Sequence, residues 1–228
     1  MMKKILVVLA IGFLWASPAL AQFTTCGQSF NYPPPTQITV TMMNNVTCGN
    51  NTVGVYLGNY VKLNLNGKTL TGGNTGTSGA GVRITGNQVN VEGPGLIKGF
   101  LRSVDVVGGS PVNLFEFAVQ AAKNTSIVTS ATSGVLMSGL DVSLTVSSSA
   151  NGIQCFGSCT LSQSKVYSHA ADGIRCSSSA CNVYFTLFSS IAGQDMQADT
   201  GATLLDYQNC PSNINALSGS TVNLNEVM

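Results

Sequence analysis

The sequence contains little charge and few of the residues that enzymes most often use. Only 8% of its 228 residues are charged, 10 lysines and arginines are balanced by 9 aspartates and glutamates, and there is a single histidine. Proteins that bind nucleic acid or an anionic membrane surface usually carry a cluster of basic residues. The sequence has no such cluster, so we do not expect nucleic acid among its partners.

The sequence also lacks a hydrophobic run that could cross a membrane. A spanning helix needs about 18 or more apolar residues in succession, and the apolar run within residues 5–15 is shorter. Because two lysines precede this run and the small-residue pattern Ala19-Leu20-Ala21 follows it, residues 1–21 are predicted to be a bacterial signal peptide. We expect a secreted protein, extracellular or periplasmic, that starts at Gln22 and has no membrane span.

Helical periodicity is nearly absent, and short apolar-x-apolar triplets take its place. They recur at intervals of roughly 22 residues, with Gly, Asn and Ser clusters between them, which is typical of strands and turns that wind into a solenoid. Leucine-rich repeats have a similar period, but these triplets lack the leucine consensus of that class. The triplets are Ile38-Thr39-Val40, Val55-Tyr56-Leu57, Val82-Arg83-Ile84, Val104-Asp105-Val106, Ile127-Val128-Thr129, Ile153-Gln154-Cys155 and Ile174-Arg175-Cys176.

Two segments strengthen this interpretation, LNLNGKTLTG at residues 63–72 and VNVEGPGLIKGF at residues 89–100. They resemble the repeats, called PbH1 repeats, of right-handed parallel β-helix proteins with the pectin-lyase-like fold. The resemblance implies an all-β, single-domain right-handed parallel β-helix, which we expect to have about eight or nine coils. It would occupy residues 38–228, with residues 22–37 as an N-terminal cap. The fold hosts lyases, hydrolases, epimerases and adhesins, so it does not imply one activity.

Four of the seven cysteines mark two neighbouring laps, and export favours disulfides. Cys155 and Cys176 are equivalent positions, as are Cys159 and Cys181. Bonds between laps and bonds within a lap are both open. Stacked Cβ atoms lie about 4.8 Å apart, wider than a disulfide prefers, which favours Cys155–Cys159 and Cys176–Cys181. A zinc site is a further alternative, which export disfavours.

The other cysteines lie towards the ends of the chain. A Cys26–Cys48 bond would hold the cap segment over the open end of the solenoid, where unpaired strand edges need cover. Cys210 is then left without a partner, because the number of cysteines is odd.

The acidic residues are too scattered to match the known enzymes of the resembled fold. Its lyases hold calcium with grouped carboxylates, and its hydrolases show Asn-Thr-Asp, Asp-Asp, Gly-His-Gly and Arg-x-Lys elements, none of which occurs here. Calcium needs several converging oxygen ligands. We therefore expect no cofactor and no metal site, with calcium only if the protein proves to be an enzyme.

One short polar segment could still support catalysis. His169, Asp172 and Arg175 would supply a base, a carboxylate that orients it and a cation for an acidic substrate. The alternative is that His169 and Asp172 are turn residues and Arg175 is solvated, which is the commoner use of such residues.

A second candidate site follows from the stacking of laps. If the outer members of each triplet point inward, the middle residues form one outward column: Thr39, Tyr56, Arg83, Asp105, Val128, Gln154 and Arg175. In this column Tyr56, Arg83, Asp105, Gln154 and Arg175 could bind a sugar chain through aromatic stacking and hydrogen bonds. The alternative is an ordinary polar sheet face with an Arg–Asp pair between laps.

Taken together, these features predict a secreted β-helix protein without a recognisable catalytic set, which acts as a glycan- or surface-binding or structural module. A polysaccharide or a cell-surface glycan is the expected partner. The alternative is a small carbohydrate-active enzyme, similar to a polysaccharide lyase or an epimerase, that acts on an acidic polysaccharide.

Overall fold

The structure is a computed structural model, and every regular element among the residues that it describes is a strand. It describes residues 21–73, 79–121, 124–130, 134–144, 150–167, 169, 171–177, 180–189, 191–207 and 214–225. Within these residues there is no helix of the length and hydropathy that a membrane span requires. The predicted signal peptide lies outside this part of the chain, apart from Ala21.

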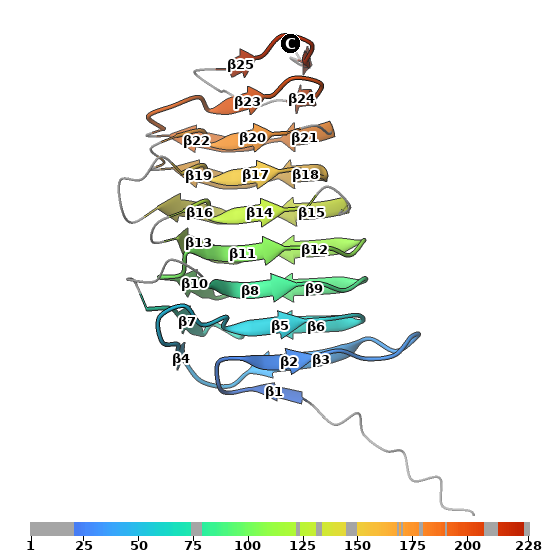
Figure 1. Ribbon diagram of the computed structural model, residues 1–228, viewed down its shortest axis with the longest axis vertical. Helices are drawn as coiled ribbons and strands as arrows, with labels where there is room; N and C mark the ends of the chain where they lie inside the picture. The colour runs from blue at the N-terminus through green and yellow to red at the C-terminus, as the bar shows by residue number, and fades with distance from the viewer. Residues whose placement is uncertain are drawn as a thin grey trace, which may run out of the picture.

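The strands form three sheets, which we call sheets A, B and C (Figure 1). Sheet A contains β1 (Ala21–Phe23), β3 (Ile38–Met42), β6 (Val61–Asn64), β9 (Val89–Glu92), β12 (Val112–Phe115), β15 (Gly134–Ser138), β18 (Ser158–Ser162), β21 (Ala180–Tyr184), β24 (Thr203–Tyr207) and β26 (Thr221–Asn225). Sheet B contains β2 (Gln28–Phe30), β5 (Val55–Leu57), β8 (Ala80–Ile84), β11 (Arg102–Val106), β14 (Ile127–Thr129), β17 (Ile153–Cys155), β20 (Ile174–Cys176), β23 (Met196–Ala198) and β25 (Ile214–Ala216). Sheet C contains β4 (Val46–Thr47), β7 (Thr69–Thr71), β10 (Leu96–Lys98), β13 (Ala118–Ala121), β16 (Asp141–Leu144), β19 (Lys165–Tyr167) and β22 (Leu187–Ser189).

The chain visits the three sheets in turn, so that each lap stacks on the one before it. After β5 in sheet B it forms β6 in sheet A and β7 in sheet C, and then returns to sheet B as β8, which pairs in parallel with β5 (Figure 1). Parallel pairing between consecutive laps continues along all three sheets. The predicted parallel β-helix is confirmed.

The number of coils is smaller than the eight or nine predicted. In the described residues sheet C has seven strands, whereas sheets A and B have ten and nine, so about seven laps contain all three strands. The triplets, all but the first of which lie in sheet B, mark one strand of a lap and not a complete lap. The prediction therefore included end laps that have no strand of sheet C among the described residues.

The alternation within each triplet explains the interior. Val55, Val82 and Val104 are paired neighbours in sheet B, and all three are fully buried. Each apolar column is thereby covered by the same column of the next lap, so that stacking creates a continuous core that no single lap could form. Sheets A and C contribute equivalent buried columns, such as Leu63 with Val91 and Ile97 with Val119.

Glycines that open several laps are required by the close stacking. A Cβ atom added to Gly54 would collide with the backbone oxygen of Gly81 in the next lap, and one added to Gly152 would lie 2.5 Å from the oxygen of Gly173. Larger residues would therefore push neighbouring laps apart, which explains the Gly-Ile and Gly-Val lap openings.

The predicted cap segment, residues 22–37, contributes strands to sheets A and B. Within it β1 pairs with β3 and β2 pairs with β5, so that the sheets extend before residue 38. The Cys26–Cys48 disulfide joins this segment to the first lap, with its Cα atoms 5.6 Å apart.

Candidate functional site

The middle residues of the triplets form the predicted column on the outer face of sheet B. Tyr56 lies beside Arg83, and Arg83 lies beside Asp105. Further along the column, Gln154 lies beside Arg175, and a valine separates it from Asp105. The stacking of these residues is confirmed, while their role in ligand binding stays a prediction.

The prediction was wrong for one member of the column. Thr39 belongs to sheet A, where it pairs with Lys62. The position next to Tyr56 is taken by Ser29 of β2. This strand was overlooked because its first inward position is the polar Gln28, so that it does not show the apolar-x-apolar pattern.

The charged residues in the column neutralise each other. The Asp105 side chain is only 7% exposed, and its Oδ1 accepts a hydrogen bond from Nη1 of Arg102 at 3.0 Å. Its Oδ2 lies 3.4 Å from Nη2 of Arg83 in the preceding lap. Because one buried carboxylate has two guanidinium partners, this pairing satisfies the charge of Asp105 without any ligand.

Arg175 is engaged in a similar way. Its Nε donates to both carboxylate oxygens of Asp199, at 2.9 and 3.1 Å, and Asp199 also accepts from Ser177 Oγ at 2.6 Å and from Gln197 Nε2 at 3.0 Å. The hydrogen bond to Asp199 raises the pKa of Arg175. Burial alone would raise the pKa of Asp199, but its three hydrogen-bonding neighbours outweigh burial and hold that pKa below its usual value.

The structure places the predicted catalytic residues in different environments. His169 is only 2% exposed, and its Nε2 lies 3.4 Å from the backbone oxygen of Val142. Burial lowers the pKa of His169 to about 4, so that the imidazole is neutral at pH 7. Among the described residues no hydrogen bond or ion pair joins His169, Asp172 and Arg175, and a catalytic role for them stays an untested prediction.

Asp172 connects successive laps. Its backbone nitrogen donates to Asn151 Oδ1 at 3.1 Å, and its own Oδ1 accepts from the backbone nitrogen of Gln194 at 3.1 Å. Asn151, Asp172 and Gln194 occupy the same turn in three consecutive laps. The side chain of Asp172 therefore satisfies a partly buried backbone amide, which is the kind of contact that the turn alternative describes.

The two disulfides of the later laps lie within laps. Cys155 bonds to Cys159 and Cys176 bonds to Cys181, with Cα separations of 6.3 and 6.2 Å. Each bond joins a strand of sheet B to the following strand of sheet A. Cys155 and Cys176 are also stacked neighbours, as predicted, but they are not bonded to each other. Cys210 lies outside the described residues.

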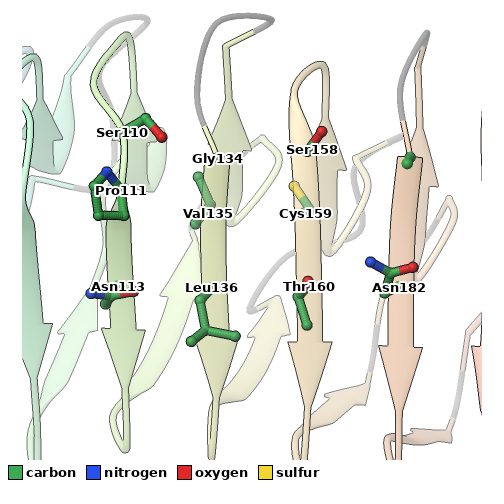
Figure 2. A pocket seen from close by; sticks show the side chains of 11 residues that line it. Ser110, Pro111, Asn113, Gly134, Val135, Leu136, Ser158, Cys159, Thr160 and Asn182 are labelled. Carbon is green, nitrogen blue, oxygen red and sulfur yellow. The ribbon is translucent and has the colours of Figure 1, made fainter.

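A hollow on the surface of the described residues lies on sheet A, not on the predicted column of sheet B. It is an open groove of about 340 Å³. Figure 2 shows that its lining comes from successive strands. The lining residues are Ser110, Pro111, Asn113, Gly134, Val135, Leu136, Ser158, Cys159, Thr160, Ala180 and Asn182. We call this feature the sheet A groove.

A row of outward residues crosses the sheet A groove. Asn113 pairs with Leu136, Leu136 with Thr160, and Thr160 with Asn182, on β12, β15, β18 and β21 (Figure 2). The row presents amide and hydroxyl groups around Leu136, which is 39% exposed, and Nδ2 of Asn113 donates a hydrogen bond to Oδ1 of Asn90 in the preceding lap at 2.8 Å. The sequence contains a signal for this row, because each member lies between two buried residues of a strand, but all except the first of the triplets that predicted the fold lie in sheet B.

In the described part of the chain, no group of three His, Cys, Asp or Glu side chains converges in the way that metal ligands do. No family model matches the sequence, and neither curated proteins nor solved structures show a match to it.

Proposed function

We propose that the protein is an exported binding module that holds a glycan chain in the sheet A groove. The observation that carries the proposal is the row of Asn113, Thr160 and Asn182 around Leu136, on four adjacent laps. Amide and hydroxyl groups exchange hydrogen bonds with sugar hydroxyls, and an exposed aliphatic side chain can contact the apolar face of a sugar ring. The three disulfides are compatible with an extracellular location.

Binding has more support than catalysis. A general base must reach its substrate within hydrogen-bonding distance, whereas His169 is buried and directed at a backbone oxygen. Arg175 is already paired with Asp199. The predicted column on sheet B is a weaker candidate for the same reason, because the cations of Arg83 and Arg175 have carboxylate partners.

A glycan array, followed by titration of the best ligand, tests the proposal. We expect retention of at least one oligosaccharide without any cleavage product. Thr160→Val removes one hydroxyl from the groove and is expected to weaken binding by roughly fivefold to tenfold, because the hydrogen bond it loses contributes about 1 kcal/mol.

Thr39→Val is the matched control. Thr39 lies on the outer face of the same sheet but outside the groove, so that its replacement should leave the affinity unchanged. Equal loss in both variants, or turnover of the bound glycan, would contradict the proposed function.

A further inference from the structure

We propose that the ligand of the sheet A groove is an uncharged glycan, and that Gly134 creates the space in which it binds. This inference rests on the proposed function and specifies the class of ligand. It differs from the acidic polysaccharide that was expected as the substrate of the enzymatic alternative.

The residues that line the groove give the first reason to expect an uncharged ligand. None of its lining residues is Asp, Glu, Lys or Arg, and strands β12, β15, β18 and β21 contain no such residue at any position. An anionic sugar would have to leave part of its hydration shell without gaining a cationic partner, which is unfavourable. A neutral sugar needs only the hydrogen-bonding groups that the groove presents.

The pairing of the nearby charged residues gives the second reason to expect an uncharged ligand. On the same face of sheet A, Lys62 in β6 is paired with Glu92 in β9, with 2.6 Å between Nζ and Oε2. This pair precedes the groove, and its cation is neutralised. Arg83 and Arg175, on sheet B, are likewise paired with carboxylates. Among the described residues, no lysine or arginine lines the groove.

The register of the strands sets the direction of the ligand. Asn113, Thr160 and Asn182 occupy equivalent positions on parallel strands, and adjacent strands lie about 4.8 Å apart. The polar groups therefore form a line across the strands (Figure 2). A chain that contacts all of them runs along the axis of the solenoid and crosses successive laps.

Gly134 makes room for the ligand at the start of β15. It lines the groove opposite Ser158, where any other residue would add a side chain. A Cβ atom at this position would meet Ser110 Oγ at 3.1 Å, a hydroxyl that can rotate away. The backbone of Gly134 is not in the left-handed region, so a β-branched residue suits this strand position. Gly134→Val should fill the groove and preserve the fold.

Calorimetric titration with two probes of equal length tests the inference. Cellohexaose is neutral, and hexagalacturonate carries a carboxylate on every ring. We expect the neutral probe to bind at least about tenfold more tightly, and its affinity to change less than about twofold between low and high salt, because screening acts on charged ligands. Mannohexaose and xylohexaose extend the neutral set.

Gly134→Val should reduce the affinity for the neutral probe by more than about tenfold, with an unchanged circular dichroism spectrum. Asn182→Ala provides a second variant that removes a groove contact without adding bulk, and Thr39→Val is the control. Preferential, salt-sensitive binding of hexagalacturonate would overturn the inference and leave the proposed function intact. Failure of every glycan to bind would overturn both. Unchanged affinity in a folded Gly134→Val protein would overturn the role of Gly134.

Discussion

The outer faces of sheets A and B are built by the same winding, but their polar residues differ in what they contact. On sheet B, Asp105 is buried between Arg83 and Arg102, and Asp199 receives hydrogen bonds from Arg175, Ser177 and Gln197. On sheet A, the groove presents uncharged amide and hydroxyl groups beside an exposed leucine.

The comparison shows that a stacked polar column is not by itself a binding site. Side chains of adjacent laps are close enough to satisfy each other, and opposite charges do so most completely. A column keeps hydrogen-bonding groups for a ligand when its members are neutral and the surface is hollow, because an amide such as that of Asn113 retains a second N–H and its oxygen after the bond to Asn90. We therefore expect residues of sheet B to affect stability and residues of the sheet A groove to affect binding.

The largest expected effect concerns the interior on which both faces depend. The pKa of His169 falls from its usual 6.5 to about 4 in the folded protein, because burial disfavours the imidazolium ion. As the pH falls, the unfolded chain therefore binds a proton at His169 at a higher pH than the folded protein does. The stability that the neutral imidazole contributes is fully present above pH 6.5. The free energy of unfolding then decreases as the pH falls towards 4, by about 3 kcal/mol in total. Urea unfolding at several pH values measures this slope.

His169→Gln removes the titrating group and serves as the control for that slope. Its free energy of unfolding should change much less between pH 6.5 and 4, whatever its value at pH 7. An equal pH dependence in both proteins would show that His169 is not the buried group responsible. If lowering the pH unfolded only sheet A or only sheet B, this would contradict the claim that both sheets depend on one interior.

The second largest effect tests the ion pairs among the charged side chains of sheet B. Asp105→Ala leaves Arg83 and Arg102 without their shared carboxylate, and we expect it to lower the free energy of unfolding by about 2 kcal/mol. The value is below that of a fully buried pair because both arginines are partly exposed and can turn towards water. Chemical denaturation at pH 7 measures the loss. A change close to zero would mean that the face is not held by this carboxylate.

A smaller loss is expected at the other charged group of sheet B. Arg175→Ala removes the cation from Asp199 but leaves the hydrogen bonds from Ser177 and Gln197, so stability should fall by about 1 kcal/mol. Asp199 has a lowered pKa, and the stability it contributes is present above its usual 3.8 and lost as the pH falls through the folded value. The difference between wild type and variant should shrink below pH 3.8. A difference that persists there would point to lost packing.

The smallest effect is expected on the face that binds. Thr160→Val and Thr39→Val both replace partly buried threonines on the outside of sheet A. Each should change the free energy of unfolding by less than about 0.5 kcal/mol, because neither removes a core contact. Thermal unfolding of the two variants checks this. A large destabilisation by Thr160→Val alone would assign Thr160 to the fold and weaken its assignment to a ligand.

The sequence predicted the stacking well because inward side chains alternate with a period of two and the triplets recur roughly once per lap. The two periods together placed Tyr56 beside Arg83 and Gln154 beside Arg175, and they placed the cysteines of neighbouring laps side by side. The prediction failed at the first lap, where Gln28 occupies an inward position that elsewhere is apolar.

The partners of the polar residues could not be predicted in the same way. Asp199 lies in a turn, and its contact with Arg175 depends on the turn conformation, which carries no periodic signal. The bond from Gln194 to Asp172 has the same origin. The sheet A groove depends on one missing side chain, at Gly134, and a glycine in the sequence does not reveal whether it opens a surface or only permits a turn.

Side-chain amide groups occur on both faces, and they allow the most direct test. NMR spectra of the amide NH₂ groups of Asn113 and Asn182 in the groove, and of Gln154 and Gln197 on sheet B, can be followed during titration with cellohexaose. We predict that the two asparagine signals shift in proportion to bound ligand while the two glutamine signals stay unchanged. Shifts of the glutamine signals with unchanged asparagine signals would contradict the account.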